Sequence, residues 1–339
     1  MVKRILLLGC GLIVFAFSGL YLLLRSSAAT SNLSLEPEQG TITSPATIFT
    51  ESGASNGSYV NFLAPATPPA SLIWQDTFDS SLDLSTATRT GAWRPNDFWQ
   101  DINKGYRDFA GSSWNLNPNE TPAYSPFSIS SGILSIKAQR TPATLNSTIA
   151  ASMAAQQQSG SVPAWSGGIL ITDKRQRTFG YGYYEFKARF PTPGKGMFPA
   201  LWLYSADGTL NPGKEGAEID ILEIFGYADG THVDSTVHFL ASNNVRARAS
   251  FNSSIVGDTA SWHTYALDWQ PTYMRFYKDN ALYAEMTGDD AAWYNGVRMG
   301  IRMNYAMDAP WFGVNASDAT TPSPLSMDID YIKVYTSKP

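Results

Sequence analysis

From residue 71 onward the sequence predicts an all-β fold, a two-sheet jelly-roll sandwich. Short apolar or alternating runs recur along this part of the chain, and Gly, Pro, Asn and Asp residues separate them. Helical periodicity is nearly absent. Many short strands divided by turn residues are typical of a sandwich or jelly roll rather than of a helical or mixed fold.

The expected strands follow one another along the chain at residues 71–78, 126–138, 167–174, 182–190, 199–204, 217–225, 234–240, 263–270, 273–286, 297–307 and 326–336. The segment KDNAL at 278–282 predicts a hairpin turn, because Asp and Asn tolerate left-handed backbone conformations. One stretch, LNSTIAASMAAQQQ at 145–158, has the Ala and Gln content of a surface helix or a mobile insertion.

Composition excludes one broad class of partner and points to another. The net charge is −5 and charged residues make up 16% of the chain, so no Lys/Arg cluster is present to neutralise nucleic-acid phosphates. Aromatic residues are abundant, with 10 Trp, 17 Tyr and 17 Phe, and such an excess often lines ligand sites. The single cysteine, Cys10, precludes an intrachain disulfide.

The N-terminal region, residues 1–30, predicts export. Residues 5–24 are uncharged and apolar, long enough at about 1.5 Å per residue to cross a bilayer. Lys3 and Arg4 favour a cytoplasmic N-terminus, which would place the rest outside the cell. A membrane anchor and a cleaved signal peptide both remain open, because small residues follow Arg25. We expect an extracellular or cell-surface protein.

Residues 31–70 are rich in Ser, Thr, Ala and Pro and end in a linker-like APATPPAS. A segment of about thirty residues within them resembles the opening strands of a β-sandwich carbohydrate-binding module. Two or three strands cannot bury a core alone, so a disordered spacer is the alternative. The predicted catalytic domain occupies residues 71–337.

The segment EIDILEIFG at 218–226 carries three carboxylates in an otherwise apolar strand. Alternate residues of a strand face the same side, so Glu218 and Asp220 share a face. Glu223 lies five positions from Glu218 and would face the opposite side in a regular strand. A one-residue β-bulge near Ile221 or Leu222 would bring Glu223 to the same face.

With that bulge, the spacing of the two glutamates predicts the carboxyl separation of about 5–5.5 Å that retaining glycosidases use. One glutamate must be ionised to attack an anomeric carbon, and the other must hold a proton for the leaving oxygen. Mutual repulsion of three acids raises the pKa of at least one. The alternative interpretation is three acids on a solvent-facing strand.

Together with other motifs, E-I-D-x-x-E followed by T-V-H resembles glycoside hydrolase family 16, the laminarinase and lichenase group, in its bulged form. The other motifs lie at 74–79, 166–174, 181–204, 261–280 and 328–335. They are WQDTFD, SGGILITDK, YGYYEFKARFPTPGKGMFPALWLY, SWHTYALDWQPTYMRFYKDN and DIDYIKVY. The match spans residues 71–336. It implies a concanavalin A-like jelly roll with a substrate cleft on its concave face.

The resemblance implies roles for individual residues. Glu218 is the implied nucleophile, Asp220 the assisting carboxylate and Glu223 the acid/base. A second group is implied to bind substrate: Trp202, which would stack on a sugar ring, His238, expected beside Glu223, Asn304, Phe198 and Trp311, the last on a loop above the cleft.

The implied activity is a retaining endo-β-glycanase of β-1,3- or mixed β-1,3-1,4-glucan, acting as a monomer without a catalytic cofactor. A structural calcium ion at Asp330 is also implied, as in several relatives. Thr77 replaces a usual Glu on the glycone side, so the reaction type is better supported than the substrate. Another β-linked polymer, such as a galactan or a bacterial exopolysaccharide, and a non-catalytic carbohydrate-binding protein of the same fold remain alternatives.

Overall fold

The structure is a computed structural model of the 339-residue chain. It describes residues 46–50, 58–62 and 69–339, apart from 87–89, 98–99, 109–111, 173–176, 206–210, 212, 215, 227–231, 241–245 and 254–257. The chain divides into two compact units, Met1–Pro68 and Pro69–Pro339.

The first unit contains two described strands, β1 (Ala46–Thr50) and β2 (Ser58–Phe62). They pair antiparallel, with Ala46 opposite Phe62. The prediction for residues 1–30 lies outside the described residues, as does the apolar run 5–24. Within the part that is described, no helix is long and apolar enough to span a membrane.

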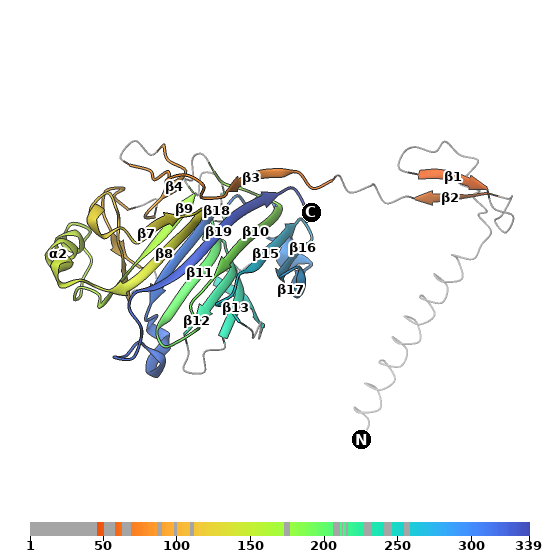
Figure 1. The fold of residues 1–339 in the computed structure, drawn as a ribbon. Helices are drawn as coiled ribbons and strands as arrows, with labels where there is room; N and C mark the ends of the chain where they lie inside the picture. Colours follow the sequence, from red (N-terminus) through yellow and green to blue (C-terminus); the bar gives the residue numbers. More distant parts are fainter. Residues whose placement is uncertain are drawn as a thin grey trace, which may run out of the picture. The chain divides into compact units, whose positions relative to one another are not determined.

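The second unit is a sandwich of two antiparallel sheets, as predicted (Figure 1). We call the first the site sheet. In spatial order its strands are β4 (Trp93–Arg94), β9 (Trp165–Thr172), β18 (Gly300–Met307), β11 (Met197–Tyr204), β12 (Glu218–Phe225), β13 (His232–Leu240) and β14 (Arg246–Ser253).

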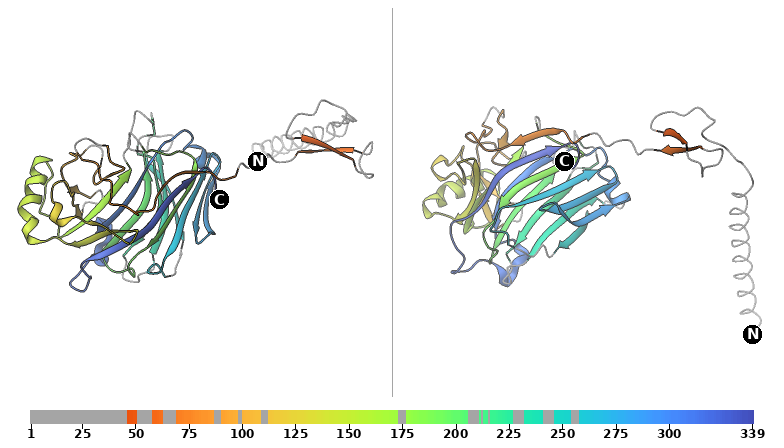
Figure 2. Two further views of the ribbon diagram at one scale, coloured as in Figure 1. Left: turned by 45° about the horizontal axis from the view of Figure 1, so that its top comes forward. Right: turned by 45° about the vertical axis from the view of Figure 1, so that its right-hand side comes forward.

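The second layer is the outer sheet, and the long strands of both layers curve along their length (Figure 2). Its spatial order is β7 (Phe127–Ser130), β8 (Ile133–Arg140), β19 (Leu325–Tyr335), β10 (Gly182–Arg189), β15 (His263–Gln270), β16 (Tyr273–Lys278) and β17 (Ala281–Thr287). Strand β3 (Leu72–Asp76) pairs with the C-terminal part of β19.

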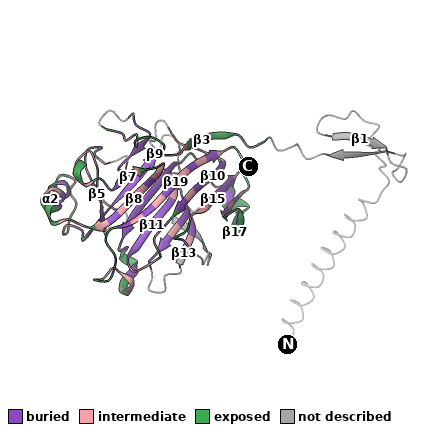
Figure 3. Ribbon diagram, in the orientation of Figure 1, coloured by how far each residue is buried: buried purple, intermediate pink, exposed green. Residues whose placement is uncertain are grey.

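The core lies between the two sheets and is built from the alternate residues of each strand. Leu201 and Ile219 reach it from the site sheet, and Phe186, Leu267 and Ile332 reach it from the outer sheet. All five are fully buried, and buried positions dominate the strands of both layers (Figure 3). Burial of this apolar surface is the main force that holds the sheets together.

Local sequence signals explain the connections. Asp279 and Asn280 both have positive φ, 49° and 65°, and they join β16 to β17 in the two-residue hairpin that the sequence predicts. The predicted helix is α2 (Asn146–Ala155), in which Ile149 and Met153, one turn apart, pack on Trp114.

Smaller elements complete the second unit: β5 (Tyr106–Arg107), β6 (Ser113–Asn115), η3 (Pro122–Tyr124), η4 (Ala143–Leu145), α3 (Asp289–Ala292) and η5 (Pro310–Asn315). Strand β6 runs parallel to β9, and the end of β8 pairs with the start of β9, which links the two sheets at that edge.

Candidate active site

Strand β12 carries a one-residue β-bulge between Asp220 and Glu223. Against β11, the neighbours Leu201 and Trp202 pair with Leu222 and Asp220, so Ile221 is the extra residue. The same shift appears on the other side, where Asp220 and Glu223 pair with β13 residues only two positions apart. The bulge lies where the sequence predicts it.

The bulge changes which side chains face the core. Ile219 and Ile221 alternate normally into the core, and Leu222 then follows directly on the same side. From Leu222 onward the alternation is reset, so Ile224 is buried and Glu223 turns away from the core. Glu218, Asp220 and Glu223 therefore share the face of the site sheet that points away from the core, which we call the site face.

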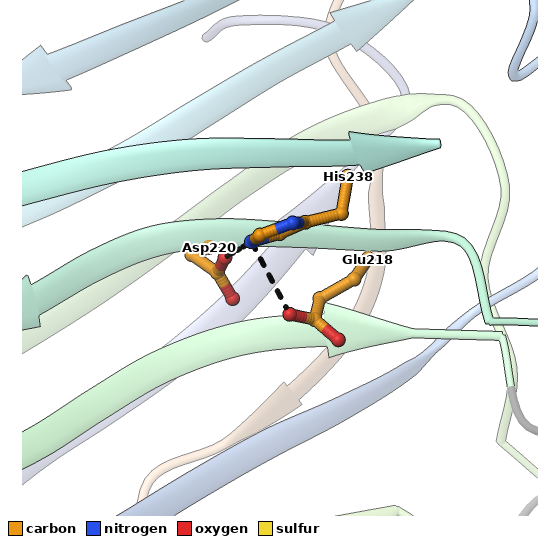
Figure 4. Close-up of side chains that lie close together, drawn as sticks. All are labelled: Glu218, Asp220 and His238. Carbon is orange, nitrogen blue, oxygen red and sulfur yellow. Dashed lines mark ion pairs between the residues drawn. The ribbon is translucent and has the colours of Figure 1, made fainter. Parts of the chain in front are cut away.

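His238 lies beside Glu218 and Asp220. Its Nε2 is 3.2 Å from Asp220 Oδ2 and 3.5 Å from Glu218 Oε1, and the three side chains point toward one another (Figure 4). The expectation that His238 lies beside Glu223 is wrong. Because β12 and β13 run antiparallel, His238 pairs with Glu218, at the far end of the motif from Glu223.

Glu223 has a strongly perturbed acid strength. Burial raises the pKa of Glu223 well above its ordinary value, and the nearby charges of Asp220, Glu218 and Asp234 raise it further. A side-chain hydrogen bond with Thr236 acts in the opposite direction on this pKa. A carboxyl group in these surroundings holds its proton to higher pH than an ordinary glutamate, which suits a proton donor.

Asp234 and Thr236 are site residues that the sequence reasoning missed. They alternate with Ser235 and Val237 on β13, and they share a face with His238. The pairing sets Asp234 opposite Glu223 and Thr236 opposite Asp220. The signal was present, because residues 234, 236 and 238 are polar and lie two apart before and within the T-V-H motif.

Trp202 occupies the predicted place beside the acids, with Asp220 as its partner across β11 and β12. Its Nε1 donates to Asn304 Oδ1 at 2.7 Å. The Arg302 guanidinium lies over the indole ring, 4.8 Å from its centroid. Asn304 is 5% exposed, so it orients Trp202 from below rather than offering a free surface.

A buried ion pair supports this tryptophan from beneath. Arg302 Nη2 lies 2.5 Å from Asp97 Oδ1, and both side chains are almost inaccessible. Sequence reasoning missed both residues, because they lie 205 positions apart and Asp97 belongs to no expected strand. A paired Arg stacked on Trp202 restricts the ring to one orientation.

A second aromatic group, which we call the aromatic cluster, lies on the side of Glu223 away from Trp202. Phe198 and Phe225 stack at 5.2 Å between ring centroids, and Phe312 packs edge-on against both. Trp311, in η5, contacts Phe198 at 5.6 Å and is 56% exposed. Phe198 itself is buried, so Trp311 is the accessible ring of this cluster.

The described contacts of Asp330 fit an ion pair better than a calcium ligand set. Its Oδ2 lies 2.7 Å from Lys187 Nζ, and a calcium ion needs six or more oxygen ligands. The calcium ion therefore stays a prediction without structural support. Among the described residues, the acidic and histidine side chains close enough to share an ion are Glu218, Asp220 and His238, with ligand atoms within 4.8 Å of one another.

The fold and the paired acids define a carbohydrate-active β-sandwich, and the comparisons with known proteins agree. Residues 133–333, more than half of the chain, match the family model of the glycosyl hydrolases family 16. The chain belongs to this family.

Two curated relatives come from Rhizobium meliloti. The endo-1,3-1,4-beta-glycanase ExsH is 32% identical over 63% of this chain, and the endo-1,3-1,4-beta-glycanase EglC is 30% identical over 68% of it. The chain spans less than half of each relative, 42% and 48% respectively.

Solved structures of the same architecture are also similar. SCLam, a non-specific endo-beta-1,3(4)-glucanase, is 25% identical with a TM-score of 0.56, over 80% of this chain and 93% of SCLam. The laminarinase from Rhodothermus marinus is 22% identical with a TM-score of 0.58, over 80% of this chain and 98% of that protein. The second likeness shows the fold alone.

Proposed function

We propose that this protein is a retaining endo-β-glycanase that hydrolyses β-1,3- or mixed β-1,3-1,4-linked glucan through a covalent glycosyl-enzyme intermediate. The observation that carries the proposal is the bulge at Ile221, which aligns Glu218, Asp220 and Glu223 on one face. The raised pKa of Glu223 adds a proton donor to that face.

In the first step, a Glu218 carboxylate oxygen attacks the anomeric carbon while the glycosidic C–O bond breaks. Protonated Glu223 transfers its proton to the departing oxygen, so the leaving chain departs as a neutral alcohol. A covalent ester then joins Glu218 to the sugar, and Glu223 becomes an anion. Loss of the charge on Glu218 lowers the repulsion that raises the pKa of Glu223.

In the second step, the Glu223 anion takes a proton from water as the water oxygen attacks the anomeric carbon. The ester bond breaks, Glu218 regains its charge and Glu223 regains its proton. Two inversions at one carbon give net retention of configuration. Asp220 assists by holding His238 and by adding negative charge beside Glu218, which favours the positively charged transition state.

The substrate assignment rests on the names of the relatives and on the aromatic residues that flank the acids. Trp202 lies on one side of Glu223 and the aromatic cluster on the other, as expected for an enzyme that holds sugar rings on both sides of the cleaved bond. The glucan endo-1,3-beta-glucosidase A1 of Niallia circulans, 27% identical over 80% of this chain and 38% of that protein, favours a glucan.

A galactan is the second candidate substrate. The keratan-sulfate endo-1,4-beta-galactosidase of Sphingobacterium multivorum is 27% identical over 81% of this chain and 57% of that protein. That alignment covers more of the chain than either of the two Rhizobium alignments.

We also propose that the enzyme works outside the cytoplasm, either secreted or anchored through residues 5–24, and as a monomer. The charge pattern of residues 3–25 supports this location. Fractionation of cells that produce the full chain, with N-terminal sequencing of the product, separates an anchor from a cleaved signal peptide.

A panel of polysaccharides tests the proposed reaction. Laminarin, lichenan, agarose and keratan sulfate are incubated with the protein, and new reducing ends and product lengths are measured. We expect a fall in average chain length of the β-glucans before monosaccharide accumulates, as an endo-acting enzyme produces. No new reducing ends from any polymer, or equal activity in Glu218→Ala, would contradict the proposal.

A further inference from the structure

The backbone carbonyl of Ile221, the extra residue of the bulge, is held by two side-chain hydroxyls. Ser235 Oγ, on β13, lies 2.8 Å from this carbonyl oxygen, and the Tyr283 hydroxyl, on β17 of the outer sheet, lies 3.2 Å from it. The two hydroxyl oxygens are 2.6 Å apart. The bulge is therefore contacted by one side chain from each of the two sheets.

The Ser235 and Tyr283 hydroxyls have one proton each, but they make three contacts. We therefore assign the protons to the shortest contacts. The two shorter contacts form a chain in which Tyr283 donates to Ser235 and Ser235 donates to the Ile221 carbonyl. Desolvation raises the pKa of Tyr283, which keeps its hydroxyl protonated. The contact of Tyr283 with Ile221 at 3.2 Å is then the longer branch of one shared proton, whose shorter branch goes to Ser235.

The bulge needs these side-chain hydrogen bonds because it interrupts the backbone hydrogen bonds between β12 and β13. Ser235 faces two residues of β12, Ile221 and Leu222, where a regular ladder gives it one. Ile221 and Ser235 are fully buried, so water cannot replace a lost partner of the carbonyl. Without the hydroxyls, this buried carbonyl would favour a shift of the bulge along β12.

We propose that Ser235 and Tyr283 are positioning residues that hold the β12 bulge in register and thereby hold Glu223 at the reaction centre. This proposal rests on the function proposed above. Glu223 is two residues from Ile221, so a shift of the bulge moves its carboxyl group directly. Glu218 precedes the bulge, so its position relative to Glu223 changes too.

The test compares Ser235→Ala and Tyr283→Phe with wild type. We expect Ser235→Ala to lower kcat at least about tenfold with little change in KM, because a misplaced catalytic group slows the chemical step more than binding. Tyr283→Phe removes only the hydroxyl that donates to Ser235, so it should lower kcat less than Ser235→Ala does. A shifted bulge admits water to Glu223, so the alkaline limb of the kcat profile should move to lower pH.

Two controls separate positioning from general stability. Tyr184→Phe removes another buried hydroxyl, which lies on β10 of the outer sheet and donates to the carbonyl of Gly180, and should leave kcat and the pH profile unchanged. Ser235→Thr keeps a hydroxyl at residue 235 and should recover most of the kcat lost in Ser235→Ala. Tyr283 is only partly buried, so Tyr283→Phe serves if Ser235→Ala does not fold.

Failure of this inference differs from failure of the proposed function. If wild type hydrolyses a polymer while folded Ser235→Ala and Tyr283→Phe keep its kcat and its pH profile, the positioning role is overturned and the function stands. If Ser235→Ala and Tyr283→Phe lose no more kcat than Tyr184→Phe does, the two hydroxyls have only a structural role. If wild type cleaves no polymer, the function and this inference fail together.

Discussion

Asp220 and Glu223 lie on the same face of β12 although they are three residues apart. In a regular strand an odd separation places two side chains on opposite faces. Here Ile221 and Leu222 both enter the core, which supplies the missing step. One inserted residue thus brings Glu223 to the face that Glu218 and Asp220 already share, where burial and the charges of these two acids raise the pKa of Glu223.

The two glutamates should have different effects when neutralised. We expect Glu223→Gln to lower kcat by about 10²–10⁴-fold on polymers, because the leaving oxygen then departs without a proton. For substrates whose leaving group needs no proton, such as dinitrophenyl glycosides, kcat/KM should be much less affected, because it reports the first step alone. Their kcat should still fall, because the second step lacks its base. Glu218→Gln should abolish activity on both kinds of substrate. Measurements of kcat/KM on the polymer and on the dinitrophenyl substrate check this, and equal losses of kcat/KM in Glu223→Gln would contradict the assignment.

The charge of Asp234 should help to determine the pH at which kcat falls on the alkaline side of its pH profile. Its charge raises the pKa of Glu223, so Asp234→Asn should lower that pKa and move the alkaline limb of kcat to lower pH. As a control, Asp330→Asn on the outer sheet should leave the profile unchanged. A profile identical to wild type in Asp234→Asn would contradict this coupling.

The Glu223 carboxyl should also lower the free energy of unfolding as pH rises. The folded state raises the pKa of Glu223 above its ordinary 4.5, so between these two pKa values the folded protein binds more protons than the unfolded one. Stability contributed by this group is therefore present below about pH 4.5 and lost as pH rises, by up to about 1.4 kcal/mol per unit. Glu223→Gln should be more stable than wild type at neutral pH.

Urea unfolding of both proteins at several pH values measures this difference. The stability gap between Glu223→Gln and wild type should widen from pH 4.5 upward and then level off once Glu223 ionises in the folded state. A gap that does not vary with pH would show that the surroundings of Glu223 do not perturb its titration.

Replacing Trp202 and replacing Trp311 should affect different kinetic constants. Trp311 is exposed at the edge of the aromatic cluster, so Trp311→Ala should remove a sugar contact of about 1 kcal/mol and raise KM about fivefold without a large change in kcat. Trp202 lies beside Asp220, and Trp202→Ala should lower kcat as well. Kinetics on a polymer and on a short oligosaccharide test this, and a fall in kcat alone for Trp311→Ala would contradict it.

The sequence predicts most of the fold, because strand alternation and turn residues are local signals. Most of the long strands, the Asp279–Asn280 turn and helix α2 follow from patterns within about ten residues, whereas strand β14 (Arg246–Ser253) is not among the expected strands. The bulge could be located as well, since the acid spacing and the core period conflict only at Ile221 and Leu222.

Long-range register is what the sequence could not supply. The sequence motif predicts His238 beside Glu223, but the pairing of β12 with β13 places it opposite Glu218. The support of Trp202 by Arg302 and Asp97 joins segments far apart in the chain. Neither pairing leaves a local pattern, so each appears only once the strands are packed.

The anomeric configuration of the first product tests the central claim most directly. Proton NMR of a β-glucan digest, recorded within the first minutes of hydrolysis and before mutarotation, reports which anomer the enzyme releases. Double displacement through Glu218 and Glu223 predicts that the β-anomer appears first and the α-anomer grows in only as mutarotation proceeds. Initial release of the α-anomer would contradict the assignment of Glu218 as a nucleophile.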